Sequence, residues 1–552
     1  MGKRLNLKWV SDEIGDTYKD WKYGDIVTIN AQTGTGKTYF ITGSNKEKGL
    51  IDNINIEETV LYLCNRLELK NQIKIDLMKK YDIKIPYLDK KGKKVLDIEK
   101  IEKITRIKNV TIMSYHQVAE YLLDREYSNK EYRLDIFNYI ICDECHYFLT
   151  DASFNNKTYI TFKELIETKH SNMIKIFISA TMDEIQAGIN KYLADSKIHT
   201  YSTGIDYSYL DVKYFDDIKN IATIIKNDKT DEKWLVFISS KKQGDKLKEL
   251  LDNSGVSNSF ITANTKTEES LNITQDSKFD CKVLISTKCL DNGVNIKDKN
   301  LKNLVVIATD KTTFIQEIGR VRFKINDAPN INLYIYKSYK KAFTTRNEMI
   351  YQPKKEDIDL FSSNIDAFKR KYNNDHHKVP TDIFYQDANN NWRINDIGIV
   401  RLDRDIKFAV KMELEFKSDE WAFIKEQLNW LNLGHTFDEI NFIENVVDED
   451  DKCDLRGYLN CLFEDKVAFL QAKDRTPLIE EIGLIDKHNS SLGVKEGKDT
   501  VIKYIKNITT LNSYLKEELG LEYSIKQFET SRIVDGTKKK FKQAWKIVKT
   551  IE

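Results

Sequence analysis

A glycine-rich loop directly after a short apolar strand is the feature that most limits what this chain can fold into. Residues 26–30, Ile-Val-Thr-Ile-Asn, have the character of a buried strand, and residues 31–38 continue as Ala-Gln-Thr-Gly-Thr-Gly-Lys-Thr. The loop fits G-x-x-x-x-G-K-[ST] except at the first glycine. Glycines let the backbone wrap around phosphate oxygens, and N–H groups of the loop and the following helix offer partial positive charge. The sequence therefore predicts a strand, a phosphate-binding loop and a helix.

The side chains of this loop have predicted roles in nucleotide binding. Lys37 is placed to reach the β- and γ-phosphates, and the Thr38 hydroxyl is placed to hold Mg²⁺. The residues predicted to bind the nucleotide are Thr33, Gly34, Thr35, Gly36, Lys37 and Thr38. Taken alone, the loop indicates only that some nucleotide is bound.

A second motif, Asp-Glu-Cys-His at residues 143–146, narrows the prediction to hydrolysis. It follows the apolar run 137–142, and ligands of open parallel sheets bind at the carboxyl ends of strands. Asp143 is predicted to hold Mg²⁺ through water and to belong to the nucleotide site. Glu144 is predicted to orient and deprotonate the attacking water. An isolated acidic pair would more simply end a strand beside solvent, but together with the loop it indicates ATP hydrolysis.

These two motifs and the patterns that follow them resemble, in order, the motifs of superfamily 2 helicases of the DExH type. The resemblance spans residues 1–345 and is specific because many weak patterns occur in one order. Besides the loop and Asp-Glu-Cys-His, the matching stretches are 60–66 with Leu69 and Gln72, then 110–115, 179–181, 235–240, 286–296 and 316–322. The resemblance implies two tandem RecA-like domains, ATP and Mg²⁺ as cofactors, and 3′ to 5′ movement along a nucleic-acid strand.

The resemblance also assigns roles to single residues, each at a position that matches a family motif. The implied catalytic residues beside Glu144 are Gln316, Arg320 and Arg322, and Gly293 is implied in cofactor binding. The residues implied to couple hydrolysis to movement are Ser179, Thr181 and His146. The residues implied to contact nucleic acid are Arg66, Ser114, Tyr115, Ser239 and Thr287.

Three departures from the family pattern matter. The last motif usually reads Q-x-x-G-R-x-x-R, but here the second arginine, Arg322, comes one position early and Phe323 takes its place. Arg320 is therefore the better candidate for the arginine finger that stabilises charge on the γ-phosphoryl group. Either arginine has the permanent, planar charge that this role requires. Arg322 is alternatively part of a solvated basic turn. Asn295 replaces a common Asp. No glutamine motif of the DEAD-box kind precedes Lys37, so the sequence does not show how adenine is held.

Composition excludes some classes of protein and leaves others open. The 552 residues include 87 Lys and Arg against 86 Asp and Glu, a net charge of +1, which gives no global sign of a nucleic-acid partner. No apolar run approaches the ~20 residues of a membrane span, and no secretory signal is visible. Seven dispersed cysteines indicate reduced thiols, and the C-x-x-C pair Cys142 and Cys145 has no partner pair for zinc. We expect a cytoplasmic protein, and the many Lys, Ile and Asn residues suggest an AT-rich bacterial, phage or mobile-element genome.

Short apolar strands that alternate with helices predict parallel sheets covered on both faces. The expected strands are 26–30, 59–63, 110–113, 139–142 and 174–178 in a first domain, and 234–238, 259–262, 282–286, 304–308 and 332–336 in a second. The expected helices include 67–81, 162–168, 242–253, 313–319, 354–372 and 421–431. The predicted divisions are a RecA-like domain at 1–204, a second at 205–345, a mainly helical accessory region at 346–487 and a winged-helix-like end at 488–552.

The tail carries the second basic signal of the sequence. Asp535-Gly536 predicts a hairpin turn, and its flanks hold Arg532 and five lysines with Phe541 and Trp545 between them. Lys539, Lys540 and Trp545 are therefore predicted to contact nucleic acid through phosphates and base stacking. A surface hairpin with Trp545 packed inward is an equally good interpretation. Short helices are expected at 513–519 and 523–530.

The sequence leaves three functions open. The first is an ATP-dependent helicase or translocase on single-stranded or tailed duplex DNA, the second an RNA helicase. The third is an ATP-driven switch or remodeller that does not separate strands, with a protein partner at the C-terminal region. No nuclease motif such as P-D-x-D-x-K stands out in the C-terminal third.

Overall fold

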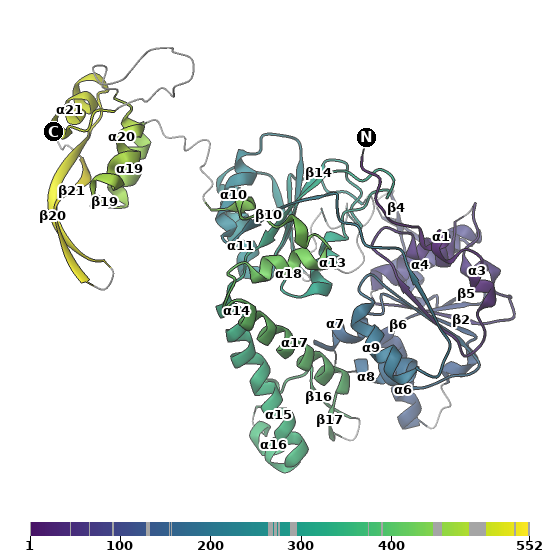
Figure 1. The fold of residues 1–552 in the computed structure, drawn as a ribbon. Coiled ribbons are helices and arrows are strands. Elements are labelled where there is room, and N and C mark those ends of the chain that lie inside the picture. The colour runs from purple at the N-terminus through teal and green to yellow at the C-terminus, as the bar shows by residue number, and fades with distance from the viewer. Residues whose placement is uncertain are drawn as a thin grey trace. The chain divides into compact units, whose positions relative to one another are not determined.

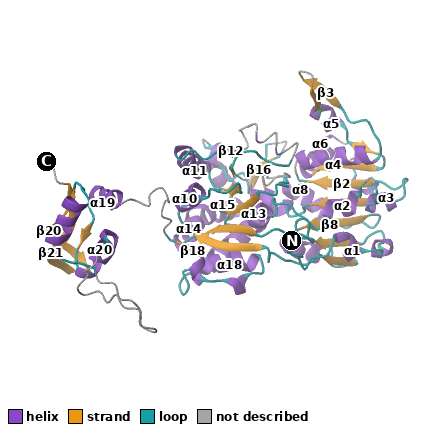
Figure 2. Ribbon diagram, turned by 90° about the horizontal axis from the view of Figure 1, so that it is seen from above, coloured by secondary structure: helices purple, strands orange, loops and turns teal. Residues whose placement is uncertain are grey.

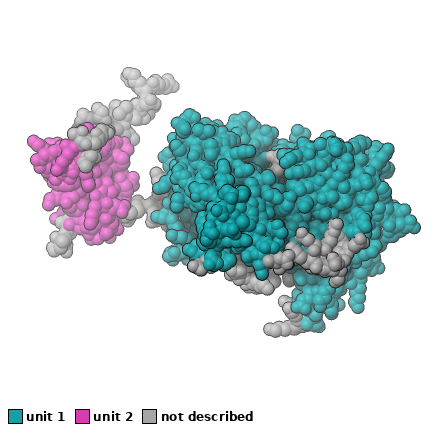
Figure 3. Space-filling view, turned by 90° about the horizontal axis from the view of Figure 1, so that it is seen from below, with its two compact units in different colours: residues 1–445 teal, residues 446–552 magenta. Residues whose placement is uncertain are grey.

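A computed structural model of the chain places the phosphate loop at the carboxyl end of residues 26–30, an inner strand of a seven-stranded sheet. The structure describes residues 2–44, 46–65, 67–90, 93–128, 133–153, 155, 157–262, 269, 273, 277–287, 295–373, 375–387, 390–444, 455–484, 504–534 and 537–549. The chain divides into two units, residues 1–445 and 446–552, which are described separately (Figure 3). Among the described residues, no helix is both long and apolar enough to cross a membrane.

The first sheet has the strand order β5-β6-β2-β7-β8-β1-β9 and is parallel apart from β5. Its strands are β1 (Ile26–Asn30), β2 (Val60–Cys64), β5 (Arg106–Ile107), β6 (Val110–Ser114), β7 (Tyr139–Asp143), β8 (Ile174–Ser179) and β9 (Ile198–Ser202). The strand β8 lies between β1 and β7, and its residue Ser179 is paired with Asn30. The strand ends that carry the phosphate loop, the acidic motif and Ser179 therefore meet at one edge.

Helices cover both faces of this sheet because successive strand residues point to opposite sides (Figure 1). Leu61 and Leu63 belong to a core with α6 (Tyr115–Ser128), α8 (Thr158–Phe162) and α9 (Asp183–Tyr192). Tyr62 and Cys64 belong to a second core on the other side. That core is completed by α1 (Val10–Ile14), α2 (Lys37–Thr42), α3 (Leu50–Asn53) and α4 (Leu67–Lys80).

The second sheet is parallel throughout, with the order β12-β13-β11-β14-β15-β10-β18. Its strands are β10 (Leu210–Phe215), β11 (Lys233–Phe237), β12 (Asn258–Ile261), β13 (Val283–Ser286), β14 (Leu301–Val306), β15 (Ile331–Tyr336) and β18 (Phe442–Ile443). Helices α10 (Ile218–Asn227) and α11 (Lys241–Asn253) cover one face, and α13 (Lys311–Ile318) lies on the other. Two tandem RecA-like α/β domains followed by a helical region confirm the predicted fold class. All ten expected strands are present, and β5, β9, β10 and β18 are additional.

An insertion and an accessory region add to this pair of domains. The hairpin of β3 (Tyr87–Lys90) and β4 (Lys93–Leu96), followed by α5 (Ile98–Lys103), projects from the first domain (Figure 2). The accessory region contains α14 (Lys340–Arg346), α15 (Gln352–Ser363), α16 (Ile365–Tyr372), α17 (Asp396–Glu415), α18 (Ala422–Trp430) and a small β16–β17 pair (Phe384–Gln386 and Trp392–Ile394).

The helix α17 connects the accessory region to the first domain. Arg401 on this helix donates from Nη1 to the carbonyl oxygens of Leu149 and Thr150, at 2.8 and 3.0 Å. These carbonyls end α7 (Tyr147–Thr150), the helix that follows the acidic motif. The region returns to the second sheet through β18, which pairs with β10. The accessory region therefore contacts both RecA-like domains.

The second unit is built around a long antiparallel hairpin, β20 (Tyr523–Val534) and β21 (Thr537–Lys549). Its other elements are α19 (Leu455–Glu464), β19 (Ala468–Phe469), α20 (Thr476–Ile482) and α21 (Ile508–Ser513). The three strands have the order β19-β21-β20, and β21 pairs antiparallel with both of the others. A winged-helix-like domain at this end of the chain stays a prediction. The turn at 535–536 lies outside the described residues.

Two expectations for this unit differ from the structure. The helix expected at 523–530 is wrong, since this stretch is strand β20, in which Tyr523 and Ile525 are buried and Lys526 is exposed. That alternation has the period of a strand. The unit also starts earlier than 488, because Leu459 and Leu478 share one hydrophobic core with the hairpin.

Candidate nucleotide-binding site

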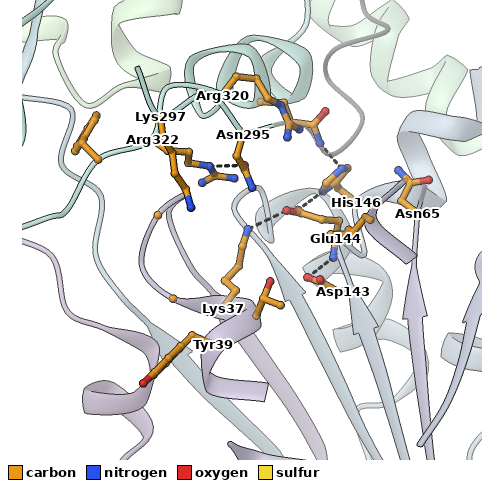
Figure 4. A pocket seen from close by; sticks show the side chains of 16 residues that line it. Lys37, Tyr39, Asn65, Asp143, Glu144, His146, Asn295, Lys297, Arg320 and Arg322 are labelled. Atoms are coloured by element: carbon orange, nitrogen blue, oxygen red, sulfur yellow. Dashed lines mark hydrogen bonds and ion pairs between the residues drawn. The ribbon is translucent and has the colours of Figure 1, made fainter. Parts of the chain in front are cut away.

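The phosphate loop opens onto a cavity of about 310 Å³ between the two RecA-like domains. Gly34 and Gly36 have φ angles of 92° and 83°, where a side chain would be strained, so these positions favour glycine. The cavity is lined by Gly34, Gly36, Lys37, Thr38, Tyr39, Asn65, Leu69, Asp143, Glu144, His146, Asn295, Lys297, Gln316, Arg320, Arg322 and Phe323. Lys37, Asp143 and Glu144 stand opposite Arg320 and Arg322 (Figure 4).

The two carboxylates of the acidic motif are held in different ways. Asp143 accepts hydrogen bonds from the Tyr62 hydroxyl at 2.7 Å and from the Glu144 N–H at 3.0 Å. Glu144 has a φ of 49°, and its Oε1 accepts a hydrogen bond from Lys37 Nζ at 3.1 Å. This uncommon backbone conformation for a non-glycine residue turns the Glu144 side chain toward the loop.

The pKa values of the two carboxyl groups shift in opposite directions. Burial raises the pKa of the Asp143 carboxyl, and the adjacent Glu144 carboxylate raises it further. Burial opposes ionisation of Glu144 as well, but the charge of Lys37 and the neighbouring His146 outweigh it and lower the pKa of Glu144. Glu144 is therefore ionised at neutral pH, as a general base must be.

The oxygen donors of this wall fit Mg²⁺. Asp143 is almost fully buried with a raised pKa, so a divalent cation beside it would relieve the cost of its charge. The Thr38 hydroxyl lines the same cavity. Mg²⁺ typically takes one or two protein oxygens and completes its shell with water and phosphate. Bound there, the ion would neutralise phosphate charge.

The opposite wall concentrates positive charge. Burial, and then the charge of Arg320, lower the pKa of Arg322 to about 10, which still leaves it protonated at neutral pH. Arg322 Nε donates to Asn295 Oδ1 at 2.6 Å, so Asn295 orients an arginine instead of standing free for a ribose. Two neighbouring guanidinium groups repel each other, and an anion such as a γ-phosphate would stabilise both.

His146 contacts three other residues of the site. Its Nδ1 lies 3.0 Å from Ser179 Oγ and 3.4 Å from Glu144 Oε2, and its Nε2 is hydrogen-bonded to the Gln316 side chain of the other domain. Ser179 Oγ in turn accepts the Thr181 N–H at 3.0 Å. The predicted coupling residues thus form one network with Glu144 and Gln316. The structure brings these side chains together, and their coupling role stays a prediction.

The predicted nucleic-acid contacts fall into two groups. Ser114 is the last residue of β6, Ser239 and Thr287 follow the carboxyl ends of β11 and β13, and none of the three is buried. Tyr115 is fully buried, stacks on Tyr147 with ring centroids 4.4 Å apart, and donates its hydroxyl to the Asp143 carbonyl. Its ring therefore has no face for a base. Arg66 and Gly293 lie outside the described residues.

Trp545 is a core residue of the second unit. It is 4% exposed, and the Arg475 guanidinium lies 4.3 Å from its ring centroid. The inward-packed interpretation of the hairpin therefore holds for Trp545, whereas Lys539 and Lys540 are exposed. The prediction that Trp545 stacks on a base is not compatible with this packing.

Several residues of the site were not anticipated. Tyr62 lies in the middle of an apolar strand, where a tyrosine gives no sign of a hydroxyl directed at Asp143. Asn65, which belongs to the matching stretch 60–66, and Lys297, which directly follows the stretch 286–296, also line the cavity. Their positions in or beside these stretches were the only signal in the sequence.

Comparison with known proteins identifies the class. Residues 16–187 match the DEAD/DEAH box helicase family, and residues 215–324 match the helicase conserved C-terminal domain. The chain therefore contains a superfamily 2 helicase core. These two domains are those of an ATP-dependent nucleic-acid helicase.

Searches with the whole chain add two findings. No curated protein matches the sequence. Similar solved structures include S. cerevisiae Dbp5 bound to RNA and ADP BeF3, with 18% identity over 58% of this chain and 81% of that chain and a TM-score of 0.40. Mycobacterium smegmatis helicase Lhr bound to ssDNA and AMP-PNP has 13% identity over 61% and 46%, with a TM-score of 0.41. A DEAD box protein from Methanococcus jannaschii has 20% identity over 59% and 85%, with a TM-score of 0.33.

Proposed function

We propose that this protein couples ATP hydrolysis to 3′ to 5′ movement along a DNA strand. The observation that carries this proposal is the cavity in which Lys37 and Glu144 of one domain face Arg320 and Arg322 of the other. ATP bound there contacts both domains, whereas ADP lacks the γ-phosphate that links them. This difference in contacts favours a closed state before hydrolysis and an open state after it, which a motor requires. The polarity follows the family resemblance.

The path of the strand is proposed from the carboxyl ends of the strands. Ser114 in the first domain and Ser239 and Thr287 in the second present hydroxyl groups near these ends. Hydroxyls and backbone N–H groups bind phosphates without reading the sequence. Opening and closing of the cavity would change the spacing between the two sets of contacts and so move the strand.

The outer half of the β20–β21 hairpin supports a DNA partner. Lys538 and Lys539 pair with Ile533 and Arg532 across the ribbon, and Lys540 follows them. About six residues of each strand extend past the core, roughly 20 Å at a rise of about 3.4 Å per residue. A two-stranded ribbon fits the major groove of B-form DNA, whereas the major groove of A-form RNA is deep and narrow. We therefore assign this ribbon to the duplex portion of a DNA substrate.

The direct test compares ATP turnover without nucleic acid and with single-stranded DNA, duplex DNA and RNA of matched sequence. We expect the strongest stimulation by single-stranded or tailed DNA, and unwinding only of duplexes with a 3′ tail. Equal or greater stimulation by RNA would replace DNA with RNA as the substrate. Turnover that is indifferent to all of them would leave an ATP-driven switch.

The triple substitution of Lys538, Lys539 and Lys540 by alanine is expected to weaken DNA binding and its salt dependence. Each lost phosphate contact lowers the slope of log Kd against log salt by about 0.9, so three contacts lower it by up to about 2.7. The matched control replaces the exposed Lys473, Lys506 and Lys516 of the same unit. Fluorescence anisotropy with a labelled tailed duplex measures the Kd and its salt dependence for both variants. An unchanged slope in the ribbon variant, or an equal change in the control, would exclude the ribbon as a DNA contact.

A further inference from the structure

Gln32 belongs to the phosphate loop, but its side chain is bonded to the connection between the two RecA-like domains. Its Nε2 donates to the carbonyl oxygen of Asp206 at 2.9 Å, and its Oε1 accepts the Asp206 N–H at 2.7 Å. Its own N–H donates to Thr203 Oγ1 at 3.1 Å. Gln32 is only 5% exposed. Both ends of its amide are thus bonded to the backbone of one residue, Asp206, in a place shielded from water.

The segment that Gln32 holds is the linker 203–209, which runs from the end of β9 to the start of β10. Its far end packs on the last motif of the second domain, where the rings of Tyr209 and Phe323 meet edge to face at 4.7 Å. Phe323 also lines the nucleotide cavity, next to Arg322. The linker therefore touches the phosphate loop on one side and the arginine wall on the other.

A strap formed by residues 2–10 fastens the same linker from outside. The Asn6 N–H donates to Asp206 Oδ2 at 2.6 Å, and the Lys8 N–H donates to the Thr203 carbonyl at 3.0 Å. The strap ends at Val10, whose N–H donates to the Thr35 carbonyl of the phosphate loop at 3.0 Å. The linker is thus held by hydrogen bonds on two sides.

The phosphate loop and the last motif are also in direct contact beside Gln32. A methyl group placed on Gly319 would come within 2.7 Å of Thr33 Oγ1. Real Cβ atoms essentially never approach this closely, so the two walls are already as near as the side chain of Thr33 allows. A shift of Thr33 toward Gly319 when phosphate binds would therefore displace Gly319 and the residues next to it.

We propose that Gln32 is a positioning residue that ties the conformation of the phosphate loop to the linker, so that nucleotide occupancy sets the relative position of the two RecA-like domains. This coupling rests on the proposed function, because it requires the phosphate loop to bind ATP. When the loop tightens around phosphate, Gln32 carries the Asp206 peptide with it, because a buried amide that loses its partners is costly. Arg320 and Arg322 then follow through the linker.

The test replaces Gln32 by Glu, which retains an acceptor for the Asp206 N–H but cannot donate to its carbonyl. Hydrogen–deuterium exchange is followed over residues 203–210 with and without a non-hydrolysable ATP analogue. We expect the analogue to slow exchange in the wild type and not in Gln32→Glu. The kcat for DNA-stimulated turnover is expected to fall about tenfold, whereas the KM for ATP changes by less than about threefold.

Two further variants separate this role from a general structural one. Thr203→Val removes the hydroxyl that accepts the Gln32 N–H, and it should reproduce the loss of coupling from the linker side. Ile205→Ala changes an exposed side chain of the same linker and leaves the hydrogen bonds of Gln32 in place, so it should keep the wild-type response. Thermal unfolding of each variant reports its stability.

The result that overturns this inference is distinct from failure of the proposed function. Linker exchange that slows normally with the analogue in both Gln32→Glu and Thr203→Val would overturn the coupling, and so would a KM change as large as the kcat change. A wild type that hydrolyses ATP with no change in linker exchange would overturn the coupling alone. A wild type that neither binds nor hydrolyses ATP would overturn the proposed function, and this inference with it.

Discussion

Replacing Glu144 by glutamine is expected to lower ATP turnover by about 10³-fold, within the range that general-base catalysis supplies, with little change in ATP affinity. The Glu144 carboxylate is ionised because Lys37 lowers its pKa, and the amide of glutamine cannot accept the proton of the attacking water. Glutamine has nearly the same shape, so the His146 network should persist. Loss of the Glu144 charge should also lower the pKa of Asp143, which favours its ionised, metal-binding form.

Single-turnover hydrolysis and equilibrium ATP binding together measure this effect. The control is Glu249→Gln, an equivalent change at an exposed position of α11. Turnover within tenfold of wild type would show that another group activates the water. A parallel loss of ATP affinity would instead show that Glu144 acts mainly by holding Lys37 in place.

Replacing Arg320 by alanine is expected to lower turnover by about 10³-fold or more, the size of the effect of arginine fingers in phosphoryl transfer. The guanidinium faces the phosphate loop from the other domain, and its charge is one of those that lower the pKa of Glu144. Because a finger acts on charge that develops in the transition state, the loss should appear in kcat more than in ATP binding.

The same measurement on Arg322→Ala decides which arginine is the finger. Arg322 also lines the cavity, and its Nε is held by a hydrogen bond to Asn295. The control is Arg370→Ala, an exposed position on α16. A loss of 10³-fold for Arg322→Ala together with a small effect of Arg320→Ala would contradict the assignment of Arg320.

The strands and the nucleotide site were predictable because their signals are local. An apolar run of four to six residues, followed by glycines or carboxylates, marks the end of a buried strand whatever lies around it. The hairpin strand at 523–530 was not predicted because its alternation is short. Phe528 follows Ile525 at the three-residue spacing of a helix, and the strand pairing is irregular between Phe528 and Thr530. The core of the second unit joins segments far apart in sequence, which explains its earlier start.

The side-chain orientations were not predictable because packing sets them. Tyr115 and Trp545 have the amphipathic character that suits both a core and a nucleic-acid contact, and only their burial shows that both are core residues. Asn295 is compatible with a ribose hydroxyl by type, yet a 2.6 Å bond to Arg322 gives it another partner. In each case the residue type allows two environments, and tertiary contacts select one.

The amino-acid sequence by itself determined the chemistry of each wall: a phosphate loop with Lys37, an acidic pair at a strand end, and an arginine pair in a second domain. These are properties of short segments whose backbone and charge act in the same way in any fold. Only the tertiary structure decided that His146 joins Glu144 to Gln316, and that Gln32 faces the linker and not the nucleotide. Those contacts join residues 170 and 174 positions apart, and they depend on how two sheets pack, which no local pattern specifies.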